Sequence, residues 1–341
     1  MPIDRSRPKS LVTGGAGFIG SHVTDELLLA GHDVVSLDDL SAGYRDNVNP
    51  QAQFVEASIT DHMLIDDLFE RHKFDYVFHL AAYAAEGLSH FIRRFNYTNN
   101  VLGSVTLINA AVRNQCQCFV FTSSIAVYGA LQTPMTEDMV PEPEDPYGIA
   151  KYAVELDLAA ARKMFGTNYI VFRPHNVYGE RQNTADKYRN VIGIFMNQLM
   201  QGLPCTIFGD GTQTRAFTHV ADVAPAIAKS VSNPAAYNQV FNIGADIPYS
   251  VKDLAEKVQR SMGKQAGIRL FPARNEVVHA YCDHEKARRV LGLHPTVTLD
   301  EGLDRMARWA LGVGPRSSRD FEAIELEQGL PVAWKTQSTT S

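Results

Sequence analysis

Short apolar segments alternate with longer amphipathic segments along the first half of the chain. The short segments, which predict strands, lie at 10–13, 33–37, 54–56, 76–81, 118–122 and 169–173. The longer segments, which predict helices, lie at 21–30, 61–71, 94–113 and 146–165. Because strands and helices alternate in this way, we expect an α/β fold built around a doubly wound, mostly parallel sheet.

The second half of the chain is less regular. Helices are predicted near 191–201, 220–232, 251–262 and 299–311, with glycine-rich turns such as 209–211 between them. We expect residues 1–175 to form the larger unit, with return segments near 217–244, and residues 176–314 to form mainly a smaller, interleaved lobe. Residues 315–341 are expected to be a loosely held tail, because their end is rich in Ser and Thr.

The composition is that of an ordinary globular protein. The 341 residues include 32 Lys and Arg against 38 Asp and Glu, which gives a net charge of -6, and 45% of the residues are hydrophobic. We do not expect nucleic-acid binding, because it needs clustered basic residues and no basic stripe is present. We do not expect a membrane protein either, because no apolar stretch approaches the roughly 18 residues that cross a bilayer.

The cysteines and the N-terminus add little chemistry. The four cysteines, at positions 116, 118, 205 and 282, are too sparse for a disulfide framework and lack the spacing of a zinc site. The first residues carry charges but no apolar signal-peptide core. We therefore expect reduced thiols, no metal and a cytoplasmic protein.

A glycine-rich turn follows the first predicted strand and opens the first predicted helix. Its sequence, GGAGFIG at 14–20, has the context of a dinucleotide site. Gly14 permits the tight turn, Gly17 lets the backbone approach a pyrophosphate, and Gly20 lets the helix pack closely. The helix N-terminus then offers amide groups and a positive partial charge to the phosphates. Taken alone, the pattern also fits an ordinary glycine-rich turn.

Asp38 stands at the end of the second predicted strand, near the usual separation from the last glycine at which a carboxylate meets the adenosine ribose. A carboxylate there repels a 2′-phosphate, and no arginine lies within 36–43 to attract one. The sequence therefore favours NAD over NADP. The alternative for Asp38 is a cap or turn residue.

Ser124, Tyr147 and Lys151 form a candidate catalytic group. Ser124 follows a predicted strand, and Tyr147 and Lys151 lie four residues apart on one face of a predicted helix. A phenol has a pKa near 10, which is too high for a base at neutral pH, and a nearby ammonium favours the phenolate. The Ser124 hydroxyl could orient the substrate oxygen that loses its proton. Without the glycine turn, a solvated helix face would be the simpler interpretation.

Seven motifs together resemble the extended short-chain dehydrogenase/reductase family, in its branch of NAD-dependent sugar-nucleotide epimerases and dehydratases. They are TGGAGFIG (13–20), HLAA (79–82), NNV (99–101), SSIAVYG (123–129), YGIAK (147–151), RPHNVYGER (173–181) and GDGTQTRAF (209–217). The resemblance covers residues 11–311. It implies a Rossmann-like fold, bound NAD, a nucleotide-diphosphate sugar as substrate and a homodimer formed through the segments 94–113 and 146–165.

The resemblance also implies roles for individual residues around the cofactor. Those at the pyrophosphate turn are Gly14, Gly17, Phe18 and Ile19, and Asp38 matches the carboxylate at the adenosine ribose. Those bordering adenine are Ser58 and Ile59, and those along the cofactor channel are Leu80, Ala81, Ala82 and Asn99. Tyr147 resembles the catalytic base, Lys151 the residue that binds the nicotinamide ribose and acidifies the tyrosine, and Ser124 the hydroxyl that orients the substrate.

Around the substrate, Asn176 and Asn190 match positions that contact the sugar nucleotide, and Arg215 matches an arginine that pairs with the diphosphate. Arg274 is a candidate second diphosphate ligand, and Phe208 lies near the strand that binds the base or belongs to the core. Glu86 is expected at a hydroxyl or amino group of the sugar or, alternatively, in solvent. We expect His175 to be a packed histidine bonded to the backbone.

The residues after Ser124 narrow the reaction within the family. Related 4,6-dehydratases carry Asp-Glu there, decarboxylases a Glu and 3,5-epimerases a Cys at the second position, whereas this chain has Ile125 and Ala126. With no proton shuttle for C3, C5 or C6, we expect epimerisation at C4 through a 4-keto sugar, with UDP-glucose and UDP-galactose as the leading pair. An NAD(P)H-dependent 4-keto sugar-nucleotide reductase and an epimerase acting at another carbon remain as alternatives.

Overall fold

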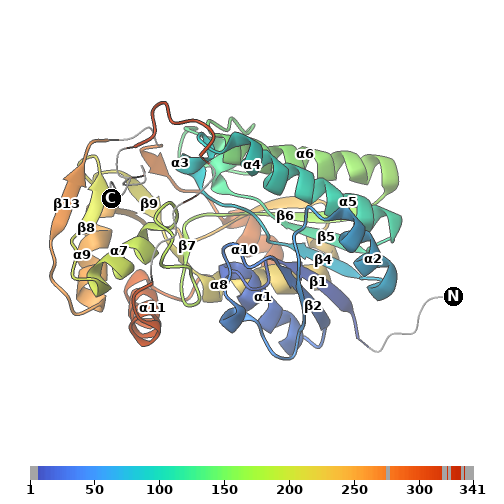
Figure 1. The fold of residues 1–341 in the computed structure, drawn as a ribbon. Coiled ribbons are helices and arrows are strands. Elements are labelled where there is room, and N and C mark those ends of the chain that lie inside the picture. Colours follow the sequence, from blue (N-terminus) through green and yellow to red (C-terminus); the bar gives the residue numbers. More distant parts are fainter. Residues whose placement is uncertain (1–6, 274–276, 317–320, 322–323, 332–333, 335–341) are drawn as a thin grey trace.

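The central element is a seven-stranded sheet in which every pair of neighbouring strands is parallel. The computed structural model describes residues 7–273, 277–316, 321, 324–331 and 334. The strands lie in the order β11 (Gln239–Ile243), β6 (Asn168–Pro174), β5 (Cys118–Thr122), β4 (Tyr76–His79), β1 (Lys9–Thr13), β2 (Asp33–Asp38) and β3 (Gln53–Glu56). The predicted Rossmann-like, doubly wound sheet is therefore confirmed (Figure 1).

Helices cover both faces of this sheet. Helices α1 (Phe18–Leu29) and α8 (Val220–Lys229) pack on one face, and α2 (His62–His72), α5 (Gly103–Arg113) and α6 (Pro146–Phe165) on the other. Neighbouring residues on a strand point to opposite faces, so Val12 belongs to the core under α1 and Leu11 to the core under α5. The burial of strands on both faces explains their continuous apolar sequences.

The predicted helix at 94–113 is present, but it changes pitch in its middle, which the sequence pattern did not show. It consists of α4 (Arg93–Tyr97), a π-helical segment at Thr98–Leu102 and α5. In this π-helical segment, the Asn100 side chain accepts a hydrogen bond from the amide of Tyr83 (2.9 Å) and donates one to the carbonyl oxygen of Tyr83 (3.1 Å). A contact with a distant loop thus accompanies the change in helical pitch.

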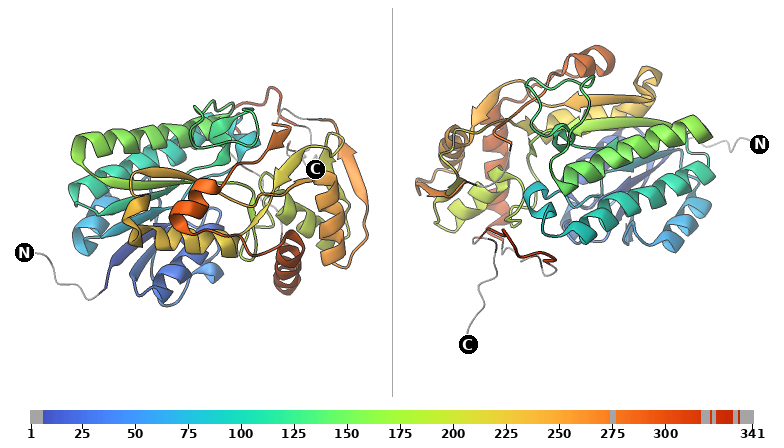
Figure 2. Two further views of the ribbon diagram at one scale, coloured as in Figure 1. Left: turned by 180° about the vertical axis from the view of Figure 1, so that it is seen from behind. Right: turned by 90° about the horizontal axis from the view of Figure 1, so that it is seen from above.

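A smaller lobe lies beyond the carboxyl ends of the strands (Figure 2). Its helices are α7 (Val191–Met200), α9 (Val251–Ser261) and α11 (Leu299–Val313), and together they enclose a separate apolar core. Its strand pairs are β8 (Cys205–Phe208) with β13 (Ile268–Phe271), and β9 (Thr214–Ala216) with β12 (Pro248–Ser250) and β14 (His279–Ala280). Strands β7 (Val177–Tyr178) and β10 (Thr218–His219) pair between the two cores. Two helices were not predicted: α3 (Glu86–Ser89) and α10 (Glu285–Leu291).

The described part of the C-terminal tail is packed, contrary to the expectation of a loosely held segment. Leu330 and Trp334 are buried against residues of the 85–95 region. The Glu325 carboxylate accepts hydrogen bonds from the amides of Arg94 (2.8 Å) and Phe95 (2.9 Å) at the start of α4. Elsewhere in the described chain, no helix combines the length and apolar character needed to cross a membrane.

Candidate active site

One cavity of about 520 Å³ opens at the carboxyl edge of the sheet and extends to the smaller lobe. This is where open α/β sheets bind ligands, and the volume suits small-molecule and cofactor sites. The predicted residues that line it are Gly14, Gly17, Phe18, Ile19, Asp38, Ile59, Leu80, Ala81, Ala82, Glu86, Asn99, Ser124, Tyr147, Lys151, Asn176, Asn190, Phe208 and Arg215. Positions far apart in the sequence thus meet in one space.

The glycine turn has the geometry that a dinucleotide requires. Gly14 has a φ of +72°, and a Cβ atom there would lie 2.8 Å from the amide nitrogen of Ala81. A Cβ on Gly20 would lie 2.0 Å from the carbonyl oxygen of Gly14, so the helix can start this close to the turn only with glycine. No side chain caps α1 at Gly17. The first amides of α1 have no partner inside the helix and are placed to receive a phosphate group.

Asp38 ends β2 beside this turn and is largely buried. Its carboxylate accepts hydrogen bonds from the amides of Ala16 (3.1 Å) and Leu40 (2.8 Å). Burial raises the pKa of Asp38, and these two backbone hydrogen bonds oppose the rise. The side chain is thus held in place at the point in the cavity where the sequence predicts the adenosine ribose.

Not all of the residues predicted to border adenine and the cofactor channel line the cavity. Ile59, Leu80, Ala81, Ala82 and Asn99 all line the cavity. Ser58 is not among the lining residues, although its neighbours Ala57 and Ile59 are. Its hydroxyl lies 2.8 Å from the Thr60 hydroxyl and accepts a hydrogen bond from the Thr60 amide (3.2 Å), so it stabilises the turn before α2.

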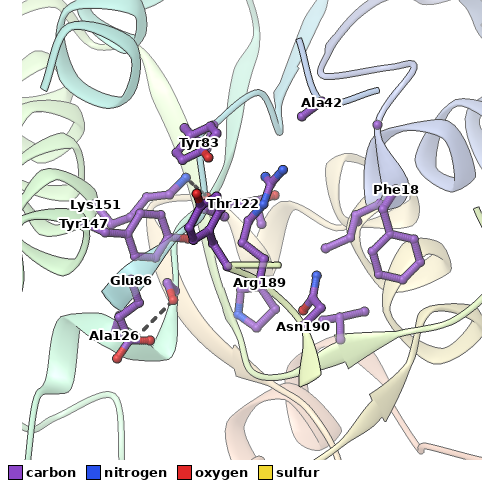
Figure 3. A pocket seen from close by; sticks show the side chains of 18 of the residues that line it. Phe18, Ala42, Tyr83, Glu86, Thr122, Ala126, Tyr147, Lys151, Arg189 and Asn190 are labelled. Atoms are coloured by element: carbon purple, nitrogen blue, oxygen red, sulfur yellow. Dashed lines mark hydrogen bonds between the residues drawn. The ribbon is translucent and has the colours of Figure 1, made fainter. Parts of the chain in front are cut away.

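Ser124, Tyr147 and Lys151 line the same cavity, and Figure 3 shows the Tyr147 and Lys151 side chains next to each other. Asp145 caps α6, and Pro146 starts it, so Tyr147 and Lys151 lie on its first turns. The Lys151 Nζ donates to the carbonyl oxygen of Thr122 (2.8 Å) and lies 5.8 Å from the centre of the Tyr147 ring. Ser124 caps the short helix that follows β5, where its hydroxyl accepts a hydrogen bond from the Ala126 amide (3.1 Å).

Burial shifts the two titratable groups of this set in opposite directions. It raises the pKa of the Tyr147 phenol, and the Ser124 hydrogen bond and the charge of Arg189 act against the rise. It lowers the pKa of Lys151 to about 7, while Glu155 acts against the fall. The net shift of Tyr147 is upward, which differs from the expectation that Lys151 acidifies it. Burial is the largest cause of this rise, and the Lys151 ammonium donates to the Thr122 carbonyl oxygen rather than to the phenol.

A buried ion pair supports this group from behind. Arg173 donates from Nε to the Glu155 carboxylate (3.0 Å) and from Nη1 to the Tyr128 hydroxyl (2.7 Å). The Ser123 hydroxyl donates to the same carboxylate (2.5 Å). Because Ser123 precedes Ser124, the network fixes the strand end that carries the Ser124 hydroxyl.

The predicted substrate residues line the other end of the cavity. Asn190 immediately precedes α7 with a φ of 58°, and Asn176 donates to the carbonyl oxygen of Ala216 (3.1 Å). Arg215 donates to the carbonyl oxygens of Thr214 (2.8 Å) and Val278 (2.9 Å), which fixes its guanidinium at the cavity wall. Phe208 ends β8 beside them. Arg274 lies outside the described residues.

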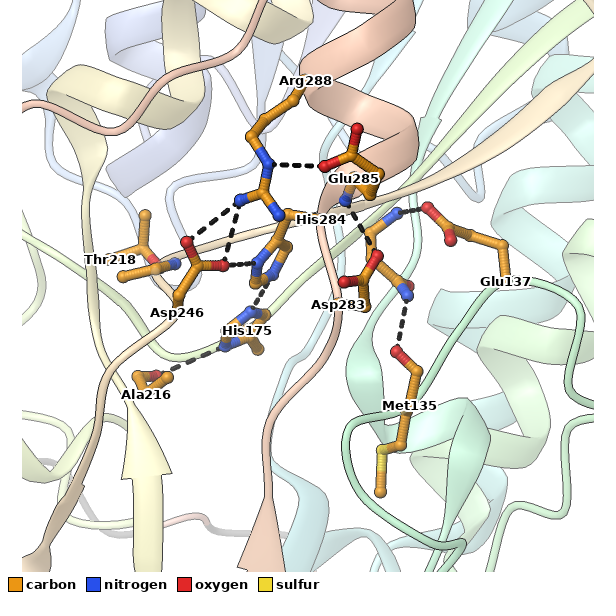
Figure 4. Close-up of polar contacts among 12 residues, drawn as sticks. Met135, Glu137, His175, Ala216, Thr218, Asp246, Asp283, His284, Glu285 and Arg288 are labelled. Atoms are coloured by element: carbon orange, nitrogen blue, oxygen red, sulfur yellow. Dashed lines mark hydrogen bonds and ion pairs between the residues drawn. The ribbon is translucent and has the colours of Figure 1, made fainter.

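His175 does not line the cavity and is buried, which agrees with the interpretation of a packed histidine. Its Nδ1 lies 3.4 Å from the carbonyl oxygen of Ala216, and its Nε2 lies 2.7 Å from Nε2 of His284. The His284 ring reaches Asp246 (2.7 Å), which also pairs with Arg288 (3.0 Å), as Figure 4 shows. This chain of contacts connects β6 to α10.

Sequence reasoning missed two residues at the part of the cavity lined by Tyr83, Glu86 and Arg189, which we call the sugar end. Arg189 is held by Asp186, to whose carboxylate its Nε donates (2.6 Å), and its guanidinium lies 4.9 Å from the centre of the Tyr83 ring. Both Arg189 and Tyr83 line the cavity (Figure 3). The one available signal was the proximity of Arg189 to Asn190 in the sequence.

Within the described residues, no cluster of His, Cys, Asp and Glu could hold a metal ion.

Comparisons with known proteins agree with this geometry. The model of the NAD dependent epimerase/dehydratase family matches residues 10–244. The UDP-glucose 4-epimerase of Mycolicibacterium smegmatis is 37% identical over 303 residues, which cover 86% of this chain and 96% of the relative. The Thermotoga maritima UDP-glucose 4-epimerase, solved with UDP-glucose, is 36% identical with a TM-score of 0.85 and covers 88% of this chain and 98% of its own.

A relative with different chemistry is also similar. The dTDP-glucose 4,6-dehydratase of Streptomyces venezuelae, solved with NAD, is 29% identical with a TM-score of 0.82, over 88% of this chain and 96% of its own. Fold similarity therefore does not distinguish epimerases from dehydratases. The family match, the glycine turn and Asp38 agree on the cofactor, which is NAD. The chain belongs to the NAD-dependent epimerase/dehydratase family.

Proposed function

We propose that this protein epimerises a nucleotide-diphosphate hexose at C4, with UDP-glucose and UDP-galactose as the leading pair. One observation carries the proposal. Ser124 and Tyr147 face the cavity together with Ile125 and Ala126, whose side chains have no titratable group. The cavity wall next to the reacting hydroxyl can therefore move a proton at one oxygen but lacks the acid–base pair that elimination needs at this position.

The residues present fit NAD. The Gly14 turn leaves no room for a Cβ, the N-terminus of α1 is uncapped, and the Asp38 carboxylate is fixed beside them. These three features would hold the pyrophosphate and the adenosine ribose. When bound, NAD supplies the acceptor and donor of the C4 hydride.

The chain's own residues handle the proton and the orientation of the sugar. The Tyr147 phenolate would take the proton of the C4 hydroxyl and return it after the 4-keto sugar has rotated. Ser124 would hold the same oxygen by a hydrogen bond, and Lys151 would stabilise the phenolate and bind the nicotinamide ribose. Arg215, Asn176 and Asn190 would hold the nucleotide end while the 4-keto sugar rotates.

The preference for UDP-hexoses is supported by the relatives rather than by the cavity. The proteins from Mycolicibacterium smegmatis and Thermotoga maritima are both named UDP-glucose 4-epimerase. At 36% to 37% identity these names support the substrate class more strongly than the individual sugar.

We also propose a cytoplasmic location, because the four cysteines are free and buried.

We further propose a homodimer. Ile149, Leu156 and Met164 form an apolar stripe on α6 and are 41%, 54% and 76% exposed. Leu102, the last residue of the π-helical segment just before the adjacent α5, is 56% exposed. A two-fold axis at this face would bury the stripe against its copy. Light scattering should report a dimer, and Leu156→Asp should yield a monomer if this face forms the interface.

A substrate panel tests the reaction. The protein, with no NAD added, is incubated with UDP-, GDP-, dTDP- and CDP-hexoses, and the C4 configuration is followed by NMR. We expect interconversion of UDP-glucose and UDP-galactose. In a parallel reaction with a 4-keto sugar nucleotide and added NAD(P)H, reduction without any interconversion in the panel would indicate the 4-keto reductase, and inversion at C2, C3 or C5 in the panel would indicate an epimerase of another carbon. Either result would overturn the proposal.

A further inference from the structure

Beyond α11 the chain continues with a residue that contacts both lobes. The amide of Arg316 and its carbonyl both pair with the Asn197 side chain of α7, each at 3.1 Å. The Arg316 guanidinium lies 3.7 Å from the centre of the Tyr44 ring, on the loop that follows β2. The chain therefore touches both lobes before it reaches the residues that we call the C-terminal strap: Phe321, 324–331 and Trp334.

The first anchor of the strap is Phe321. Its ring centre lies 4.9 Å from that of Phe95 and 5.3 Å from that of Tyr83, and the Phe95 and Tyr83 rings lie 5.2 Å apart. Three aromatic rings at these separations form a mutually packed group. The Arg189 guanidinium also lies near the Tyr83 ring, 4.9 Å from its centre. Phe321 thus packs behind the ring on which Arg189 lies.

The second anchor is Trp334, which is 5% exposed. Its ring centre lies 5.3 Å from that of Tyr188, the neighbour of Arg189. A Cβ on Gly87 would lie 3.1 Å from Trp334 Cη2, so the indole packs directly on the backbone of α3. Glu86, the preceding residue of α3, lines the cavity. The Trp334 indole therefore contacts α3, which carries Glu86, and Tyr188, which precedes Arg189.

Glu325 and Leu326, which lie between the two anchors, hold the start of α4 and the residue Phe91 before it. Glu325 accepts hydrogen bonds from the amides of Arg94 and Phe95, which have no partner within the helix. The amides of Glu325 (2.8 Å) and Leu326 (3.2 Å) donate to the carbonyl oxygen of Phe91. The strap thus holds the 83–97 region by side-chain and backbone contacts together.

We infer that the C-terminal strap is a positioning element of the sugar pocket, and that Phe321 and Trp334 set the positions of Tyr83, Arg189 and Glu86 against the sugar. The inference rests on the proposed function. The loops 83–92 and 183–190 contain no strand of the central sheet, so their position depends on what packs behind them. Residues that support a site from behind decide whether it is held within the tolerance that catalysis needs.

The test compares Trp334→Ala with the wild-type protein, using UDP-glucose as the probe. We expect the KM to rise about tenfold and kcat/KM to fall with it, because the sugar walls are displaced while the cofactor end is not. The amount of NAD that copurifies should stay unchanged. Trp334→Phe should restore most of the affinity, since it keeps an aromatic ring against Gly87. Leu326→Ala, on the same strap but 50% exposed, is the matched control and should leave the KM unchanged.

Phe321→Leu provides a milder second variant in case Trp334→Ala does not fold, and it should raise the KM in the same direction. The inference is overturned if the variants lower only the melting temperature and keep the wild-type KM. The wild-type panel is measured first, so a protein that epimerises no sugar overturns the proposed function separately. In that event, calorimetric Kd values for UDP-glucose replace the KM, and equal Kd values in wild-type and Trp334→Ala would overturn the inference.

Discussion

The two ends of the cavity are built on different principles. The cofactor end uses backbone: a glycine turn, an uncapped helix N-terminus and strand ends from one parallel sheet. The sugar end uses side chains from loops, with Arg189 held by Asp186 and Tyr83, and Tyr83 held by a strap far away in the sequence. The similarity to a 4,6-dehydratase covers 88% of this chain, and so both ends, which means that individual side chains rather than the fold decide the reaction.

The largest effect should come from Tyr147, where the two ends meet. Tyr147→Phe removes the hydroxyl that moves the proton, and we expect turnover to fall about a thousandfold because general acid–base catalysis contributes on this scale. The copurified NAD should stay at the wild-type level. Measurement of kcat together with NAD content checks both. Tyr152→Phe, one turn further along α6, should keep its activity; full activity in Tyr147→Phe would exclude the phenol as the base.

The cofactor end alone should respond to Asp38→Ala. The carboxylate holds the turn through Ala16 and is predicted to hold the ribose, so its loss should weaken NAD binding roughly 10- to 100-fold, the scale of a hydrogen bond to a charged group. The KM for the sugar nucleotide, measured with saturating NAD, should barely change. The neighbouring Asp39→Ala, an exposed carboxylate, is the control. Equal NAD affinity in both variants would contradict the assignment.

The sugar end should respond to loss of the Arg189 charge. Arg189 lowers the pKa of Tyr147, against the effect of burial, so Asp186→Asn with Arg189→Gln should raise that pKa. The acidic limb of the kcat/KM profile should move to higher pH, and kcat/KM at neutral pH should fall about tenfold. Changing both residues avoids a buried, unpaired Asp186. An unchanged pH profile would show that Arg189 does not act on the phenol.

A smaller, graded effect should come from His79, in the sheet below the cavity. The Ser104 hydroxyl donates to the Asn100 carbonyl (2.7 Å), so it accepts from Nε2 of a neutral His79 (2.8 Å). Burial lowers the pKa of His79 from 6.5 to about 3, with the Lys151 charge adding to the fall. As the pH drops below 6.5, the unfolded chain binds a proton that the folded protein does not. The free energy of unfolding should therefore decrease by up to about 1.4 kcal/mol per pH unit.

Urea denaturation at several pH values between 7 and 5 measures this slope. His175 contributes in the same direction, because burial lowers its pKa to about 3 as well. The difference between wild-type and His79→Gln isolates His79. We expect the variant to show the shallower slope, and identical slopes would mean that the imidazole is not kept neutral.

The sequence predicted the parts of the fold that local signals determine. Helix α6 runs from Pro146 to Phe165 as predicted, because Asp145 caps its start and Gly166 ends it in a left-handed conformation. The predicted helix at 94–113 is present as a continuous helical run over 93–113, but the sequence did not show the π-helical segment inside it, which accompanies the bond from Asn100 to Tyr83. The packed strap was missed for the same reason: Glu325 binds the amides of α4, more than 200 positions earlier in the chain.

The candidate site divides in the same way. Motifs placed Tyr147, Lys151 and Ser124 in one cavity, because strand ends and helix starts bring motif residues to one sheet edge. No local pattern indicated that Arg189 would reach this cavity, since its position follows from Tyr83 and Asp186. Nor could spacing show that burial raises the pKa of Tyr147, because burial is a property of the assembled lobes.

The edge strand β11 has a consequence for biosynthesis. It pairs with β6 along Gln239–Ile243, after the chain has left the sheet and built α7, β8 and β9 of the smaller lobe. A nascent chain released only as far as β6 still exposes the open edge of that strand and lacks α8, which covers Val12 and Phe172. The last step of sheet assembly must therefore wait until the ribosome has translated residues well beyond Tyr147.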